Sequence, residues 1–66
     1  MNSVEIEQLK QDLATKVGTL ENKINSGKIN DETSLELVAN YKEYEKNGIT
    51  IEELKLLYDD VILALS

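Results

Sequence analysis

The sequence predicts an all-α protein, a three-helix bundle built on an antiparallel helical hairpin. Apolar residues recur at intervals of three and four along most of the chain, which is the period of an α-helix. Proline is absent, so no helix interior is interrupted by it. Glycines and helix-capping residues divide the 66 residues into helices of about 4–25, 31–46 and 51–65, which we expect to form a single domain, residues 1–66.

The first helix is expected from about residue 4 to residue 25. Its apolar positions follow one another at intervals of 3, 4, 4, 3 and 4 and form a narrow stripe: Ile6, Leu9, Leu13, Val17, Leu20 and Ile24. Asn2 or Ser3 can cap its first backbone N–H groups. Asp12 and Lys16 are four residues apart, so we expect an ion pair between them. Gly18 lies away from the stripe, and we expect a tolerated surface glycine there.

The second helix is expected over residues 31–46. The first helix ends near Gly27, a residue that readily takes a left-handed backbone conformation. Asn30 or Asp31 can cap the next helix, and Asn47 and Gly48 end it. Its apolar residues are spread over a wide arc: Leu35, Leu37, Val38, Ala39, Tyr41 and Tyr44.

The junction before the third helix carries the most specific local signals in the chain. Thr50 and Glu53 form a T-x-x-E capping box, and Ile49 with Leu54 forms a hydrophobic staple. If Gly48 is left-handed, Ile49 also closes the end of the second helix through a Schellman contact. A turn this short predicts that the second and third helices lie antiparallel.

The third helix, over residues 51–65, is the element around which we expect the others to pack. Its main apolar stripe has intervals of 3, 4, 3 and 4 and consists of Ile51, Leu54, Tyr58, Val61 and Leu65, widened by Leu57 and Ile62. Leu56 and Leu63 are seven residues apart and lie on a different face, among Glu52, Asp59 and Asp60. This helix is therefore apolar on two faces, which is more than a fold of 66 residues readily covers.

The composition limits how so small a domain is stabilised and what it binds. Cysteine and histidine are absent, which excludes disulfides and the usual zinc ligands and leaves regular helix packing and self-association. Thirteen acidic residues against seven lysines give a net charge of −6, which argues against direct nucleic-acid binding and against a basic helix on a membrane surface. No apolar run is long enough to span a membrane and we expect no signal peptide, so the expected location is cytoplasmic.

We expect no enzymatic activity, no cofactor and no metal site. The chain has no histidine or cysteine to act as base or nucleophile. Neighbouring carboxylates such as Asp59 and Asp60 point about 100° apart on a helix and do not converge on one substrate atom. An EF-hand calcium loop aligned on Gly27 would place Ile24 and Thr33 where oxygen-rich ligands belong, so we reject that site.

The predicted function is protein–protein assembly through the third helix, as a homo-oligomer or as an adaptor. The expected partner is a protein, with a second copy of this chain preferred. The predicted partner-binding residues are Glu52, Leu56, Tyr58, Asp59, Asp60 and Leu63. For the tyrosines, Tyr41, Tyr44 and Tyr58, packing at the edge of the core is preferred over contact with a partner.

The alternative hypothesis is an acidic inhibitor that occupies the basic surface of a nucleic-acid-binding protein. Its carboxylates would stand in for phosphates; they are Asp31, Glu32, Glu36, Glu43, Glu45, Glu52, Glu53, Asp59 and Asp60. Salt distinguishes the two hypotheses, because it weakens a charge-mediated complex steeply and a leucine-mediated assembly very little. The size and composition are similar to those of short helical proteins of bacteriophages and bacterial regulatory operons, although no motif identifies a family.

Overall fold

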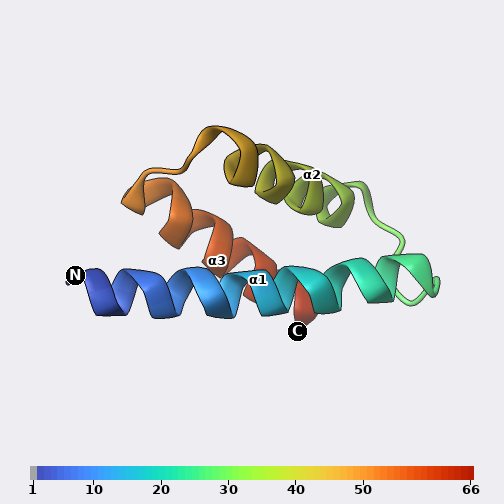
Figure 1. The fold of residues 1–66 in the computed structure, drawn as a ribbon. Coiled ribbons are helices and arrows are strands. Elements are labelled where there is room, and N and C mark those ends of the chain that lie inside the picture. Colours follow the sequence, from blue (N-terminus) through green and yellow to red (C-terminus); the bar gives the residue numbers. More distant parts are fainter. Residues whose placement is uncertain (1) are drawn as a thin grey trace.

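The structure, a computed structural model, describes residues 2–66, which form three α-helices packed together (Figure 1). They are α1 (Ser3–Asn25), α2 (Glu32–Asn47) and α3 (Ile51–Leu65). This confirms the all-α class and the three predicted helices, whose ends all lie within one residue of the prediction. Met1, which the predicted domain 1–66 includes, lies outside the described residues. Every pair of helices is in contact, and in Figure 1 α3 leads from the α2–α3 turn down to the middle of α1.

Each helix begins after a residue whose side chain caps the backbone. Asn2 and Asp31 each accept a hydrogen bond from the backbone N–H three residues further on, at 2.9 and 2.7 Å. Before α3 the capping box is complete. Thr50 accepts from the Glu53 N–H at 3.2 Å, while the Glu53 carboxylate accepts from the Thr50 N–H at 3.1 Å. These bonds satisfy backbone donors that have no partner inside a helix, which is why the predicted helix starts are confirmed.

The two interhelical turns use glycine in different ways. Gly27 has a φ of 80°, and its N–H and that of Lys28 bond to carbonyls of the last turn of α1 at 3.1 and 2.9 Å, the two bonds of a Schellman motif. Gly48 also has a positive φ, 92°, but its ψ of 167° is extended rather than left-handed helical. The condition for a Schellman contact at Gly48 is therefore not met, whereas the left-handed residue expected at Gly27 is confirmed. The physical reason is the length of the second turn, because the chain must already be extended at Thr50 to cap α3.

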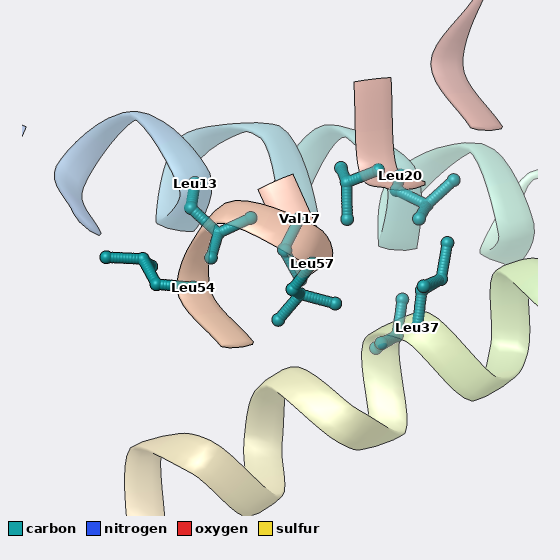
Figure 2. Packing of buried hydrophobic residues seen from close by; sticks show 8 residues of the cluster. Leu13, Val17, Leu20, Leu37, Leu54 and Leu57 are labelled. Atoms are coloured by element: carbon teal, nitrogen blue, oxygen red, sulfur yellow. The ribbon is translucent and has the colours of Figure 1, made fainter. Parts of the chain in front are cut away.

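One hydrophobic core joins the three helices, and Figure 2 shows its side chains pointing toward one another. Its buried members are Leu13, Val17 and Leu20 of α1, Leu37 and Val38 of α2, and Leu54, Leu57 and Val61 of α3. Leu20 and Val61 have no exposed surface at all. The apolar spacing in the sequence predicted all of these positions as helix-face residues, because a helix repeats every 3.6 residues.

The core differs from the prediction at its edges. Ile51 was placed in the main stripe of α3 but is 45% exposed, and Ile62 is 38% exposed. Both lie on one flank of α3. The residues that face inward are Leu54, Leu57 and Val61, on the side of the helix away from that flank. On α2, Leu35 is half-exposed, whereas Ser34 is fully buried. The apolar arc of α3 is so wide that spacing alone does not determine which part of it faces the other helices.

Candidate functional site

The strongest candidate site is the side of α3 that faces away from α1 and α2. There Leu56 is 66% exposed and Leu63 is 71% exposed, whereas Leu54 and Leu57 on the opposite side of the same helix are 2% and 4% exposed. We call this surface the α3 outer face; it consists of Glu52, Leu56, Asp59, Asp60 and Leu63. Five of the six residues that the sequence predicted to bind a partner therefore lie on one side of a single helix.

Negative charge surrounds the two leucines of the α3 outer face. Glu52, Asp59 and Asp60 are exposed, and within residues 2–66 none of them takes part in an ion pair. Glu52 lies in the first turn, where the positive end of the helix dipole stabilises a carboxylate. Asp59 and Asp60 lie in the second half, and the last turn of α3 contains no basic residue. The surface is therefore apolar at its centre and mainly acidic at its rim, where exposed Lys55 lies one turn from Glu52 and from Asp59.

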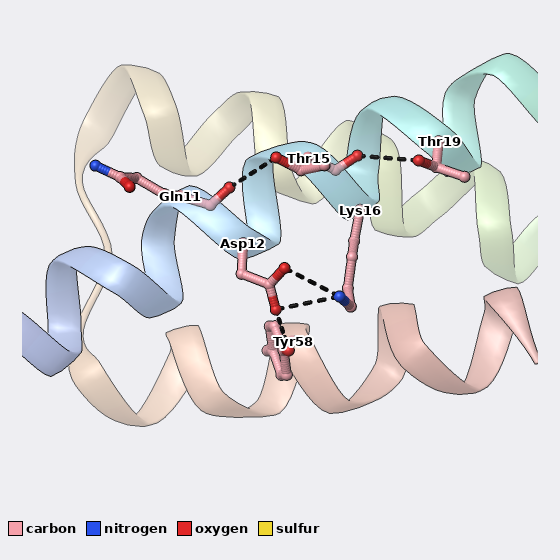
Figure 3. A network of polar contacts seen from close by, with 6 residues as sticks. All are labelled: Gln11, Asp12, Thr15, Lys16, Thr19 and Tyr58. Atoms are coloured by element: carbon pink, nitrogen blue, oxygen red, sulfur yellow. Dashed lines mark hydrogen bonds and ion pairs between the residues drawn. The ribbon is translucent and has the colours of Figure 1, made fainter.

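Tyr58, the sixth predicted contact residue, lies on another side of α3 and is half-buried against α1 (Figure 3). Its hydroxyl donates a hydrogen bond to the Asp12 carboxylate. Asp12 also accepts from the Lys16 ammonium at 3.0 and 3.1 Å, which confirms the predicted ion pair. The Lys16 nitrogen lies 5.7 Å from the centre of the Tyr58 ring, within the range of a cation–π contact. This network links α3 to α1 and separates Tyr58 from the leucines of the α3 outer face.

The network shifts the pKa of each of its members. The hydrogen bonds from Tyr58 and Lys16 lower the pKa of Asp12, because they stabilise its charged form. The same carboxylate raises the pKa of Lys16 and that of Tyr58, because it accepts hydrogen bonds from their protonated forms and so stabilises them. At neutral pH the network therefore consists of a carboxylate, an ammonium and a neutral phenol.

A shallow groove lies between α1 and α2, a feature that the sequence analysis did not identify. Its volume is about 260 Å³, and its lining is Glu21, Ile24, Asn25, Leu35, Val38, Ala39 and Lys42. Lys42 bridges its two walls through an ion pair with Glu21, at 2.8 Å. Leu35 is half-exposed, so the groove offers apolar surface to solvent. The signal for it was present in the sequence as the wide apolar arc of the second helix, only part of which faces the core. We call this surface the α1/α2 groove.

A second hollow, of about 270 Å³, lies near the α2–α3 turn. Its lining is Lys10, Leu13, Tyr41, Tyr44, Glu45, Gly48, Ile49 and Leu54. Tyr41 and Tyr44 are half-buried and pack against the core, which is the position preferred for them from the sequence. Burial is the main cause of a raised pKa in both phenols.

The acidic residues of the inhibitor hypothesis are spread over α2, α3 and their caps. Asp31 and Glu53 are engaged in capping, and hydrogen bonds from Ser34 and Thr50 respectively lower their pKa values. The other seven are exposed. In residues 2–66 no group of three acidic side chains is arranged to hold a metal ion.

Comparison of the chain with protein-family models, with curated proteins and with solved structures gives no match. None of the helices formed by residues 2–66 has the length and apolar character needed to cross a membrane.

Proposed function

We propose that this protein acts in protein–protein assembly through the α3 outer face, as a homo-oligomer or as an adaptor. The observation that carries the proposal is the exposure of Leu56 and Leu63 on a helix whose opposite side forms the core. Full burial of a leucine side chain is worth about 1.5–3 kcal/mol, so each of these two would gain roughly 1–2 kcal/mol on being covered. Paired exposed leucines with a polar rim are typical of a surface that binds another protein.

In this proposal α2 and α3 act as an antiparallel helical hairpin that presents the α3 outer face to the partner. The short α2–α3 turn and the complete capping box at Thr50 and Glu53 support the hairpin, because they join the two helices with little freedom. Binding is the whole of the proposed role, without catalysis and without a cofactor.

Sedimentation over a concentration series tests the proposal. We expect the apparent mass of the wild-type protein to rise between micromolar and millimolar concentration, and the double variant L56Q/L63Q to remain a monomer with unchanged helix content. Val4 is 63% exposed and lies on α1, so V4Q is a matched control that we expect to associate like the wild type. A wild-type protein that stays monomeric throughout would exclude self-association. Equal apparent masses of L56Q/L63Q and V4Q would exclude the α3 outer face as the site of association.

The second candidate function is the acidic inhibitor of a basic nucleic-acid-binding surface. One observation favours it: among residues 2–66, Asp12 and Glu21 are the acidic residues found in ion pairs with lysine, so most of the thirteen acidic residues take part in no ion pair. We expect such a complex with a basic domain to weaken steeply when salt is added. Titration of a basic DNA-binding domain with the wild type and with L56Q/L63Q separates the two functions, because an inhibitor that acts by charge keeps its affinity without the leucines.

A further inference from the structure

One peptide bond of the chain has the composition that favours spontaneous deamidation of asparagine. The sequence contains six asparagines, and Asn47 is the one that glycine follows. In deamidation the backbone nitrogen of the next residue attacks the side-chain carbonyl carbon of asparagine, so the two atoms must approach closely. Glycine allows that approach because it has no Cβ and a wide range of backbone conformations. We therefore expect Asn47–Gly48 to be the most reactive bond of this kind in the unfolded chain.

The fold places this bond at the surface. Asn47 is the last residue of α2, and both Asn47 and Gly48 are exposed to solvent. A Cβ added at Gly48 would meet nothing within 4 Å, so no neighbouring group blocks a movement of the backbone there. Water, the second reactant in deamidation, therefore reaches this bond freely.

Two hydrogen bonds hold the reacting groups in an unreactive arrangement. The Gly48 N–H donates to the Tyr44 carbonyl oxygen at 2.7 Å, and the nitrogen becomes a nucleophile only when it loses that proton. The Asn47 Nδ2 donates to the Glu43 carboxylate, also at 2.7 Å. This bond directs the carboxamide back toward the preceding turn of α2, away from the peptide nitrogen that would attack it. Reaction therefore requires the last turn of α2 to open.

We propose that Asn47 is a site of spontaneous deamidation, and that Glu43 and the last turn of α2 control its rate in the folded protein. When the turn opens, the Gly48 amide loses its proton to solvent and its nitrogen forms a bond to Asn47 Cγ. The bond between Cγ and Nδ2 breaks, and the Nδ2 group takes up a proton from solvent and leaves as ammonia. Water then adds to either carbonyl carbon of the succinimide ring and opens it to aspartate or isoaspartate. No oxidant or reductant takes part.

Both products alter the end of α2. A carboxylate replaces the carboxamide that donates to Glu43, so two like charges face each other within one helical turn. The new charge also lies at the negative end of the helix dipole. Isoaspartate additionally adds a carbon atom to the main chain directly before the turn that joins α2 to α3. Deamidation therefore weakens this turn irreversibly as the protein ages.

Mass spectrometry after prolonged incubation tests the assignment of the site. The full-length wild type is incubated at mildly alkaline pH, once folded and once in concentrated guanidinium chloride, and the masses of peptides that contain each asparagine are followed. In guanidinium chloride we expect Asn47 to deamidate faster than any other asparagine. In the folded protein we expect Asn47 to react several-fold more slowly, because only the open fraction of the helix end reacts.

Glu43 and Glu45 offer a matched pair of variants, because both are exposed acidic residues near the end of α2 and Glu43 is the one bonded to Asn47. We expect E43A to speed deamidation of Asn47 in the folded protein about two-fold, the size expected for a side-chain hydrogen bond on a helix, and E45A to leave it unchanged. E43Q keeps an acceptor oxygen and should react at close to the wild-type rate, which separates the hydrogen bond from the charge. Hydrogen exchange of the Gly48 amide should rise in E43A by a similar factor.

N47D represents the aspartate product and tests the consequence of the reaction. We expect N47D to lower Tm by about 2–6 °C, because it adds a like charge beside Glu43 and at the negative end of the dipole. E43Q combined with N47D should recover most of this loss, because the amide at position 43 can donate to the new carboxylate.

Each part of the proposal has an outcome that overturns it. If another asparagine reacts faster than Asn47 in guanidinium chloride, the assignment of the site is wrong. If Asn47 reacts equally fast in the folded and unfolded protein, the last turn of α2 does not control the rate. Equal rates in E43A and E45A overturn the role of Glu43, and a wild-type Tm in N47D overturns the weakening of the turn.

Discussion

Tyr58 of α3 donates a hydrogen bond from its hydroxyl to the carboxylate of Asp12 on α1, across 46 positions of sequence. This contact holds one side of α3 against α1. Leu56 and Leu63 lie on a different side of the same helix and remain exposed. The rotation of α3 about its own axis thus determines both what is buried and what is available to a partner.

Replacement of Tyr58 by phenylalanine tests this link. Y58F keeps the ring but removes the hydroxyl that donates to Asp12, so we expect the pKa of Asp12 to rise toward its ordinary value and the free energy of unfolding to fall at neutral pH. The pKa of Asp12 can be followed by the NMR shift of its carboxyl carbon during an acid titration. Y41F removes the hydroxyl of another half-buried tyrosine and should leave that pKa unchanged. An Asp12 pKa that is the same in Y58F and the wild type would contradict the link.

Acid is expected to remove stabilisation that the carboxylates of Asp12, Asp31 and Glu53 provide. Their pKa values are lowered in the fold, so the unfolded chain binds protons more readily. Their stabilisation is complete well above the ordinary pKa values of Asp and Glu, at about pH 5–6, where the unfolded carboxyls are ionised. It is lost progressively as the pH falls through those values and then through the lowered ones. Urea unfolding of the wild type and of D12N at several pH values measures this for Asp12.

We expect the wild type to exceed D12N in free energy of unfolding at pH 7, and this difference to shrink steadily as the pH falls through the lowered pKa of Asp12. The comparison isolates Asp12 because the relief of general charge repulsion by acid is closely similar in both proteins. A difference that stays constant from pH 7 to low pH would show that the stabilisation does not come from the ionised carboxylate.

Two leucines of α3, only two positions apart, are expected to respond very differently to truncation. Leu54 is 2% exposed, so L54A leaves a cavity in the core and should cost about 2–5 kcal/mol. That is comparable with the roughly 3–10 kcal/mol expected for a whole domain of this size. Leu56 is 66% exposed, and L56A should change the stability by no more than about 0.5 kcal/mol. Urea unfolding at low micromolar concentration measures both without a contribution from self-association; similar losses in both variants would refute the assigned orientation of α3.

Two glycines form a second matched pair, and we expect alanine to act on them with opposite sign. At Gly18 and at Gly48 an added Cβ would meet nothing within 4 Å, so packing does not distinguish them. Gly18 lies inside α1, where alanine is better than glycine by about 1 kcal/mol. Gly48 has a φ of 92° and a ψ of 167°, a conformation that costs other residues about 1–3 kcal/mol.

Thermal unfolding of G18A and G48A measures this contrast. A change of 1 kcal/mol corresponds to about 4–8 °C in Tm for a domain of this size. We therefore expect Tm to rise in G18A and to fall in G48A. A higher Tm in both variants would mean that the turn at Gly48 relaxes to a backbone conformation that alanine adopts without strain.

The limits of each helix could be predicted from the sequence because helix starts and stops depend on groups within a few residues of each other. The reciprocal bonds of Thr50 and Glu53 span three residues, and Asp12 meets Lys16 within one turn. The same local periodicity placed Leu56 and Leu63 opposite the stripe of Leu54 and Val61. That is why the residues of the α3 outer face could be predicted from the sequence alone.

The tertiary structure alone decided how each helix is rotated about its axis. Spacing did not reveal that Ile51 would lie at the surface or that Ser34 would be buried, because the apolar arcs of α2 and α3 are wider than the surfaces that cover them. The α1/α2 groove beside Leu35 depends on the approach of two helices, which no local signal encodes. The partner of Tyr58 depends on the same approach. Local hydrogen bonds and side-chain periodicity act over three or four residues, whereas rotation and grooves arise from packing between segments far apart in the chain.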